Sequence, residues 1–202
     1  MTKHLPEDVR RQQILDAARK CFIEKGYYPT RMEDIARAAA LSKGGIYFHF
    51  ESKKRIFEAL VRQEYEESAQ FLESIAEADG DYAEMFQAMA RHYLVTFGQR
   101  PEQPRFFMVM GEMAGRDESV RRMLAALQDE YNQVVGRIIQ AGIDAGAIKP
   151  VDPRAAAILL KGIIDAVEGY MAIGLDMDIE RLLATGMELL SDGLLQRAAG
   201  GD

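Results

Sequence analysis

The sequence predicts an all-α protein of about nine helices, and three observations indicate this fold class. Apolar residues recur at three- and four-residue spacing through most of the 202 residues. Residues with helix-capping chemistry precede several of these apolar stretches. Only the segment Ile46–Phe50 is rich in the aromatic and β-branched residues that favour a strand, and no second strand is predicted nearby to pair with it.

The composition narrows the classes of protein that the chain can represent. Its 48% hydrophobic and 28% charged residues are ordinary for a globular protein with a buried core. No apolar run is long enough to span a bilayer, and the first residues lack the apolar segment of a signal peptide. The single cysteine, Cys21, excludes an internal disulfide. We therefore expect a cytoplasmic protein that does not associate with a membrane.

The charge is unevenly distributed along the chain. Residues 1–55 hold 12 Lys and Arg against 7 Asp and Glu, a net charge of +5, and the remaining residues carry −12. The overall charge of −7 argues against a general polyanion binder. We therefore expect only the N-terminal part to contact nucleic acid.

The first two helices carry recognisable end signals. Val9–Lys25 has an apolar face, and Gly26 stands where a glycine commonly ends a helix. Thr30 and Glu33 match the S/T-x-x-E capping box, which predicts the start of a second helix that runs to about Ala39.

The segment LSKGGIYFHF is predicted to form a short third helix despite its strand-favouring residues. Ser42 is its predicted N-cap. Ile46 and Phe50 are four residues apart and are expected to face the core. The side chains predicted to face solvent are Lys43, Tyr47 and Phe48.

Six longer helices are predicted to follow. Ser52 is the predicted N-cap of the first of them, and the prolines of RPEQPR are expected to break the chain between the second and third. The predicted ranges are Lys53–Ala76, Tyr82–Phe97, Arg105–Met113, Asp117–Ala145, Arg154–Ile173 and Ile179–Gln196.

The stretch TRMEDIARAAALSKGGIYFHFESKKRIFEAL closely resembles the DNA-binding signature of the TetR family of bacterial transcriptional regulators. The match consists of a Gly-Tyr turn, a Thr, an Ile-Ala pair, and S-K-G-x-I-Y-x-H-F followed by S-K, within about residues 10–60. The rest of the chain is similar in helix order and length. The resemblance implies a homodimeric, ligand-released repressor. It also implies a helix-turn-helix DNA-binding domain over residues 1–51 and an effector-binding and dimerisation domain over residues 52–202.

The residue types around the third helix suit contact with DNA. Lys43 can reach a guanine edge or a phosphate, and Gly44 and Gly45 allow the backbone to approach closely. Hydroxyl and imidazole groups can donate to phosphate oxygens, and the start of the next helix offers free N–H groups to another phosphate. Together with the resemblance, these features predict DNA contacts at Thr30, Arg31, Ser42, Lys43, Gly44, Gly45, Tyr47, His49, Ser52 and Lys53.

Two positions depart from the family pattern. The turn between the second and third helices usually reads Ala-Gly-Val, but here it is Ala39-Ala40-Leu41. Losing a glycine at a left-handed position costs about 1 kcal/mol, so we expect a turn of a different shape. Gly45 stands where members often carry a larger base-contacting residue.

The middle of the chain is rich in Met and aromatic residues. Such side chains repack around varied apolar ligands, although ordinary core packing explains any one of them. The resemblance favours a pocket for a mostly apolar small molecule. The predicted effector contacts are Met85, Met89, His92, Tyr93, Phe106, Phe107, Met110, Tyr131 and Asp165, with Glu112 and Asn132 as further polar candidates.

The last two predicted helices can form a two-fold four-helix interface. Small residues allow close helix approach, and apolar residues follow on the last helix; intrachain packing explains the same pattern. The residues are Ala157, Gly162, Ala166 and Gly169, with Leu182, Met187, Leu190 and Leu194.

Two other functions remain as alternatives. One is a ligandless or activating DNA-binding regulator. The other, a distant third, is a helical-bundle enzyme. His4, His49 and His92 are too scattered for a metal site, and the chain has no Glu-x-x-His pair, P-loop or G-x-S-x-G motif. We therefore expect no catalytic site, no metal and no cofactor.

Overall fold

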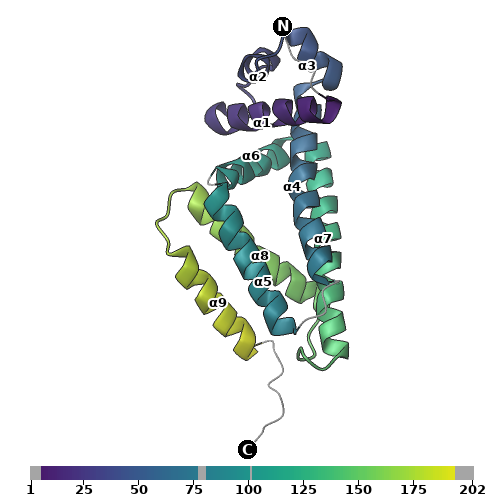
Figure 1. The fold of residues 1–202 in the computed structure, drawn as a ribbon, viewed down its shortest axis with the longest axis vertical. Coiled ribbons are helices and arrows are strands. Elements are labelled where there is room, and N and C mark those ends of the chain that lie inside the picture. The colour runs from purple at the N-terminus through teal and green to yellow at the C-terminus, as the bar shows by residue number, and fades with distance from the viewer. Residues whose placement is uncertain (1–5, 77–80, 101, 194–202) are drawn as a thin grey trace, which may run out of the picture. The chain divides into compact units, whose positions relative to one another are not determined.

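The computed structural model describes residues 6–76, 81–100 and 102–193, which form nine α-helices with no strand among them. This confirms the predicted fold class. The helices are α1 Glu7–Lys25, α2 Met32–Ala38, α3 Lys43–His49, α4 Lys53–Ala76, α5 Tyr82–Gln99, α6 Gln103–Arg116, α7 Glu118–Asp144, α8 Pro153–Ala172 and α9 Ile179–Gly193 (Figure 1).

Most predicted helix ends lie within a few residues of the observed ones. The start of α6 differs, because Pro104 lies in its first turn rather than in the break before it. A proline is tolerated there since the first N–H groups of a helix have no partner within the helix. The predicted end of the last helix at Gln196 lies outside the described residues, as does Leu194.

The chain divides into two compact units. The first unit comprises the described residues up to Tyr65 together with Arg105–Ala125. The second unit comprises Glu66–Pro104 and the described residues from Ala126 onward. Helices α4 and α7 therefore each contribute to both units.

The core of the first unit is built around α1, which packs against α2 (Figure 1). Ile14, Ala18 and Phe22 on the buried face of α1 are fully inaccessible to solvent. The ring of Phe22 lies 5.3 Å from that of Tyr27 and 6.0 Å from that of Phe57 on α4, measured between centroids. This aromatic cluster fixes α4 to α1 beneath the α2–α3 segment.

Helix α6 and the start of α7 belong to the same unit as the N-terminal helices. The buried ring of Phe106 packs on Phe57, with centroids 5.9 Å apart. Lys54 Nζ donates to Asp117 Oδ2 at 2.7 Å, and the guanidinium of Arg116 lies 5.1 Å from the ring centre of Tyr28. The hydrogen bond from Lys54 is the largest of the effects that lower the pKa of Asp117. These contacts fasten a segment from the middle of the chain to the N-terminal segment.

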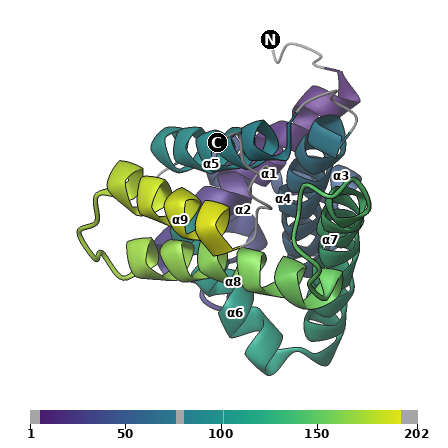
Figure 2. The same cartoon turned by 90° about the horizontal axis from the view of Figure 1, so that it is seen from below.

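The second unit contains α5, α8, α9 and the larger part of α7. Helix α5 packs against α9, and α8 and α9 run alongside each other in Figure 2. The imidazole of His92 on α5 stacks on the ring of Phe71, with centroids 3.6 Å apart and planes inclined by 11°. Desolvation in this environment lowers the pKa of His92, so the ring is neutral at neutral pH.

Candidate DNA-reading helices and effector cavity

Helix α2 starts one residue later than the predicted capping box requires. Its N-cap is Arg31, whose backbone N–H donates to Asp34 Oδ2 at 3.0 Å. The predicted box of Thr30 with Glu33 is therefore wrong. Thr30 is only 1% exposed, and its hydroxyl is directed to the backbone oxygens of Gly26 and Cys21, at 2.7 and 3.2 Å. Thr30 thus joins the end of α1 to the start of α2 and does not offer its side chain to DNA.

The turn between α2 and α3 keeps a left-handed residue without glycine. Ala40 has a φ of +51°, and the N–H of Leu41 donates to Ala36 O at 2.9 Å. The expectation of a different turn shape, made to avoid this strain, is therefore wrong. Packing of Ala39 and Ile35, 2% and 0% exposed, holds the turn in place.

Helix α3 forms as predicted and presents an unusual face. Ser42 Oγ accepts the N–H of Gly45 at 3.1 Å and caps the helix. Ile46 is fully buried, whereas Tyr47 is 45% and Phe48 is 82% exposed. The predicted helix and its core and solvent faces are confirmed.

Lys43, at the first turn of α3, forms an ion pair with Glu33 on α2. The pair lowers the pKa of Glu33 and raises that of Lys43, and both side chains remain about half exposed. The ammonium is therefore positively charged and reachable, but the carboxylate competes with any phosphate or base for it.

Lys53 at the start of α4 has a structural role that the sequence did not predict. Its ammonium donates to the carbonyls of Tyr27, Tyr28 and Thr30 at 2.6, 3.2 and 2.7 Å. It also lies 4.3 Å from the ring centre of Tyr27. An ammonium has three N–H donors, and all three are used here. We therefore replace the predicted phosphate contact of Lys53 with a role in holding the α1–α2 turn.

The remaining predicted DNA contacts differ in exposure. Ser52 Oγ accepts the N–H of Arg55 at 3.2 Å and so occupies the start of α4. His49 is half-buried, and its carbonyl accepts a hydrogen bond from Arg11 Nη1 at 2.9 Å. The side chains that the structure leaves exposed on the predicted surface are Arg31, Ser42, Lys43, Tyr47 and Phe48, with the backbone of Gly44 beside them.

An apolar cavity of about 110 Å³ lies within the second unit. Helices α5, α8 and α9 line it with aliphatic, Met and aromatic side chains. Met89 and Tyr93 are the predicted effector contacts among them. The full lining is Phe86, Met89, Ala90, Tyr93, Leu160, Ile163, Ile164, Val167, Leu182, Leu183, Gly186, Met187 and Leu190.

Several polar side chains lie near Tyr93. We call this group the tyrosine–acid cluster; it consists of Tyr93, Tyr131, Lys161, Asp165 and Glu168. The two tyrosine hydroxyls are 2.8 Å apart, and Lys161 forms an ion pair with Asp165. Desolvation, with contributions from both acids, raises the pKa of Tyr131 to about 12 and that of Tyr93 well above its usual value. Both phenols are therefore neutral at pH 7. The structure thus brings together three of the predicted effector contacts.

The other predicted effector contacts are not among the residues that line this cavity. Met85 lines a separate hollow of about 290 Å³ with Tyr82 and Val134, and His92 stacks on Phe71. The remaining three, Phe106, Phe107 and Met110, belong to the first unit, whereas the cavity is built from the second. Phe106 has a packing role against Phe57 and beneath the guanidinium of Arg19.

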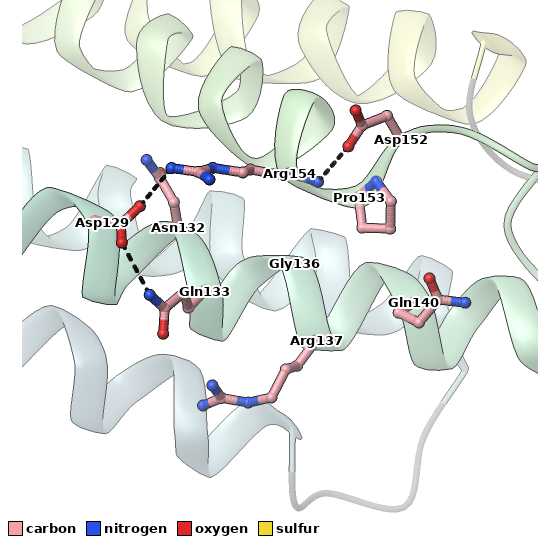
Figure 3. Close-up of a pocket in the computed structure, with 9 residues that line it drawn as sticks. All are labelled: Asp129, Asn132, Gln133, Gly136, Arg137, Gln140, Asp152, Pro153 and Arg154. Carbon is pink, nitrogen blue, oxygen red and sulfur yellow. Dashed lines mark hydrogen bonds and ion pairs between the residues drawn. The ribbon is translucent and has the colours of Figure 1, made fainter.

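A larger hollow, of about 450 Å³, lies between α7 and the start of α8 (Figure 3). Seven of its nine lining residues have polar side chains, and both of its acids have partners. Arg154 Nη2 donates to Asp129 at 2.8 Å, and Asp152 accepts the N–H groups of Arg154 and Ala155 as the N-cap of α8. This hollow suits an apolar effector less well than the smaller cavity.

Sequence reasoning missed the cavity residues of α8 and α9 and two members of the tyrosine–acid cluster. A signal was available for Lys161 and Glu168. Together with Asp165, they are charges placed three and four residues apart inside an otherwise apolar stretch, AAAILLKGIIDAVEGYMA. Charged residues in such a helix are usually paired or functional.

Within residues 6–76, 81–100 and 102–193, no group of three His, Cys, Asp or Glu side chains is arranged to hold a metal ion. None of the helices in this part of the chain is both long enough and apolar enough to cross a membrane.

Comparison with known proteins identifies the family. Residues 14–60 match the model of bacterial regulatory proteins of the tetR family, and residues 79–168 match a Tetracyclin repressor-like C-terminal domain. The uncharacterized HTH-type transcriptional regulator YfiR of Bacillus subtilis is 28% identical over 184 residues, covering 90% of this chain and 87% of that protein.

Two further similarities extend over most of the chain. The HTH-type transcriptional repressor AcnR of Corynebacterium diphtheriae is 28% identical over 178 residues, covering 88% of this chain and 83% of AcnR. The solved SmeT–triclosan complex superposes with a TM-score of 0.81 at 22% identity, covering 96% of this chain and 95% of that one. SmeT is the repressor of a Stenotrophomonas maltophilia multidrug efflux pump. With a helix-turn-helix whose second helix presents Lys43 and Tyr47, and with both family models matched, this chain belongs to the TetR family of DNA-binding transcriptional regulators.

Proposed function

We propose that this protein is a ligand-released repressor that binds a pseudo-palindromic operator as a homodimer in the cytoplasm. The observation that carries the proposal is the exposed face of α3, which combines a charged Lys43, a half-exposed Tyr47 and a backbone made accessible by Gly44. A short helix with this surface, preceded by a tight turn, suits insertion of its N-terminal residues into the major groove.

Dimer formation is supported by apolar residues exposed on α8 and α9. Leu159, Ile163 and Leu189 are 69%, 57% and 71% exposed. Exposed apolar side chains of this size on adjacent helices favour burial against a partner. A second copy also supplies the second reading helix, since one short helix contacts only a few base pairs.

Ligand control is supported by the apolar cavity and by the ligand-bound neighbour. The cavity offers an apolar molecule a site remote in sequence from α3, and SmeT was solved with triclosan. A ligand releases DNA only if it binds the two conformations with different affinities. To weaken operator binding about 100-fold, the two affinities must differ by about 2.7 kcal/mol.

Selection of bound sequences from a random DNA pool with the full chain tests the operator proposal. We expect two inverted half-sites with centres about one helical turn apart or slightly more. Lys43→Ala is expected to weaken the selected site by about 1–3 kcal/mol, and Tyr47→Phe to weaken it as well. Lys149→Ala, which changes a lysine of the second unit, is the matched control. A single unrepeated half-site, or unchanged binding by both α3 variants, would contradict the proposal.

The ligand site is tested by filling the cavity. Met89→Trp places a larger ring among the lining residues and should abolish release by compounds that dissociate the wild type from its operator, while operator affinity stays nearly unchanged. Met108→Trp is the matched control, because Met108 is 50% exposed on α6. The site is refuted if Met89→Trp responds to these compounds like the wild type. If no compound dissociates the operator complex, the ligandless or activating regulator becomes the better description.

A further inference from the structure

We propose that Phe48 is a base-reading residue of α3 that recognises the methyl group of a thymine in each half-site of the operator. This inference rests on the proposed function, because it takes α3 to be the helix that enters the major groove. It adds one side chain that determines sequence specificity and the chemical group that this side chain selects. Phe48 is not among the DNA contacts predicted from the sequence.

Phe48 lies on the side of α3 that faces away from the protein core. Successive residues of an α-helix are about 100° apart, so residues two positions apart point about 160° away from each other. Phe48 and Ile46 have this spacing. Ile46 is fully buried, whereas Phe48 is 82% exposed, more than any other large apolar side chain among the described residues. The ring therefore lies at the centre of the surface that α3 can insert into a groove.

The backbone of α3 beside this ring carries no side chains. Gly44 and Gly45 lie four and three residues before Phe48, in the direction in which a helical side chain leans. Apart from adjacent residues and the helix backbone, the atom nearest to a Cβ added at Gly44 or Gly45 would be Ser42 Oγ, at 4.0 and 3.4 Å. Packing against the described residues therefore does not require glycine at either position, although glycine weakens a helix. The bare backbone instead gives another molecule room to reach the Phe48 ring.

The ring of His49 packs against that of Phe48. Their centres are 5.0 Å apart and their planes are inclined by 88°, an edge-to-face arrangement that aromatic pairs favour. His49 itself is half-buried, and its backbone carbonyl accepts a hydrogen bond from Arg11 Nη1 at 2.9 Å. The contact with His49 restricts the Phe48 ring before DNA binds, so less conformational freedom is lost on binding.

The thymine methyl is the group in the major groove that a phenyl ring can recognise. The edges of the other bases present hydrogen-bond donors and acceptors there, whereas thymine adds a C5-methyl group. A phenyl ring cannot pair with donors or acceptors, and covering them would desolvate them without compensation. Contact with the methyl group instead removes apolar surface of both partners from water.

The surroundings of Phe48 favour DNA over a protein as its partner. Residues 1–55 carry a net charge of +5, and the exposed Arg31 and Lys43 belong to the same predicted surface. Lys43 and Tyr47, four residues apart, form a polar row on α3 beside Phe48. A protein-docking surface is usually a contiguous apolar patch, whereas here one apolar ring stands among charged and polar groups. This combination suits a polyanion whose groove contains single methyl groups.

The experiment removes the methyl group from the DNA and the ring from the protein. In the operator selected from the random pool, each thymine is replaced in turn by deoxyuridine in both half-sites, which keeps every hydrogen-bonding group. The Kd of the full chain is measured by fluorescence anisotropy. At one or more thymine positions, we expect uracil to weaken wild-type binding about fourfold per half-site, or about 15-fold in total, the effect of exposing one methyl group.

The Phe48 variants show whether this preference comes from the ring. Phe48→Ala should bind the thymine operator about 15-fold more weakly or worse, and should bind the thymine and uracil operators equally. Because uracil changes the shape of the DNA equally for every variant, the comparison isolates the direct contact. Phe48→Leu keeps an apolar side chain and should keep most of the preference for thymine. Met108→Ala, at a residue 50% exposed on α6 of the first unit, is the matched control and should keep all of it.

Three results would overturn the inference: selected half-sites without thymine, uracil operators bound like the thymine operator, or an unchanged thymine preference in Phe48→Ala with wild-type helix content by circular dichroism. In the last case, a weakening shared by all operators assigns Phe48 to the sugar–phosphate backbone, and unchanged affinity assigns it to another partner, such as a protein.

Failure of the proposed function has a different signature. A single unrepeated half-site refutes the dimeric operator, and an operator complex that no compound dissociates refutes ligand release. In both cases the dependence of the thymine preference on Phe48 is still measured, and its presence supports the inference on its own.

Discussion

Ala40, in the turn between α2 and α3, has a φ of +51°, a backbone conformation that favours glycine over residues with a Cβ. The left-handed region costs a residue with a Cβ about 1 kcal/mol or slightly more. Ala40→Gly removes this strain, partly offset by the greater freedom of glycine in the unfolded chain. We expect the free energy of unfolding, measured by urea denaturation, to rise by about 0.5–1 kcal/mol.

The same substitution inside a helix provides the opposite control. Ala126 is exposed in the middle of α7, where glycine costs about 1 kcal/mol relative to alanine. Ala126→Gly should therefore lower the free energy of unfolding. A loss of stability in both variants would show that the turn holds Ala40 without strain.

His92 is expected to make stability depend on pH. Burial against Phe71 lowers its pKa in the folded protein, whereas the pKa of an unfolded histidine is about 6.5. As the pH decreases below about 6.5, the unfolded chain binds the proton before the folded chain does. The free energy of unfolding therefore decreases until the pH reaches the folded-state pKa. His92→Phe keeps a stacked ring and has nothing to titrate. When the pH is lowered from 7.5 to 5.5, the Tm of the wild type should therefore decrease more than that of the variant. An unchanged difference between the two Tm values would contradict this assignment.

Among the elements, the start of α4 stabilises the α1–α2 turn through the side chain of Lys53. Lys53→Met keeps the aliphatic stem and removes the donors to the three carbonyls of Tyr27, Tyr28 and Thr30. Hydrogen bonds from a charged group contribute about 1.5–3 kcal/mol each, and water replaces part of this at a partly exposed site. We expect a loss of about 1–3 kcal/mol in the free energy of unfolding.

DNA binding distinguishes this role from a phosphate contact. If Lys53 neutralised a phosphate, its loss would lower the salt slope of operator binding by about one unit. We expect the slope of Lys53→Met to equal that of the wild type. Lys20→Met changes a side chain that is 72% exposed on α1 and serves as the stability control.

Local signals predicted the helices well and their tertiary contacts poorly. The periodicity of Ile14, Phe22 and Ile46 was sufficient to place helices and buried faces, because each signal lies within a few residues of the element that it describes. Thr30 was assigned to a capping box because its local pattern allows one. The structure instead directs it to Cys21 O, nine residues away, and no local pattern contains that partner.

In the candidate sites too, local features were predicted and tertiary contacts were not. The exposure of Lys43 and Tyr47 follows from helical spacing and was predicted. The pairing of Lys43 with Glu33 was not, because it depends on how α2 and α3 meet. For the cavity, Met89 and Tyr93 were found through side-chain type. Aliphatic residues such as Leu183 were not, since their chemistry does not separate a cavity wall from ordinary core.

For the molecule as a whole, the exposed apolar residues of α8 and α9 predict its assembly. Leu159→Glu and Leu189→Glu each place a charge on the proposed dimer surface, where burial would leave it unpaired. Each variant should be a monomer by light scattering at micromolar concentration and should lose most of its operator affinity. Val95→Glu, at a residue 52% exposed on α5, is the matched control. Unchanged dimers in both α8 and α9 variants would place the interface elsewhere.

The attachment of α6 and the start of α7 to the N-terminal helices limits how this regulator can be rebuilt as a biosensor. A chimera that transplants residues 1–51 onto a foreign sensor would separate Tyr28 from Arg116. Extending the graft to Tyr65 would still leave Phe57 without Phe106 and Lys54 without Asp117. A graft that preserves these contacts takes Arg105–Ala125 along with the first 65 residues, in two pieces. The transferable part of this protein is thus discontinuous, and crossover points chosen from the sequence signature alone would cut through it.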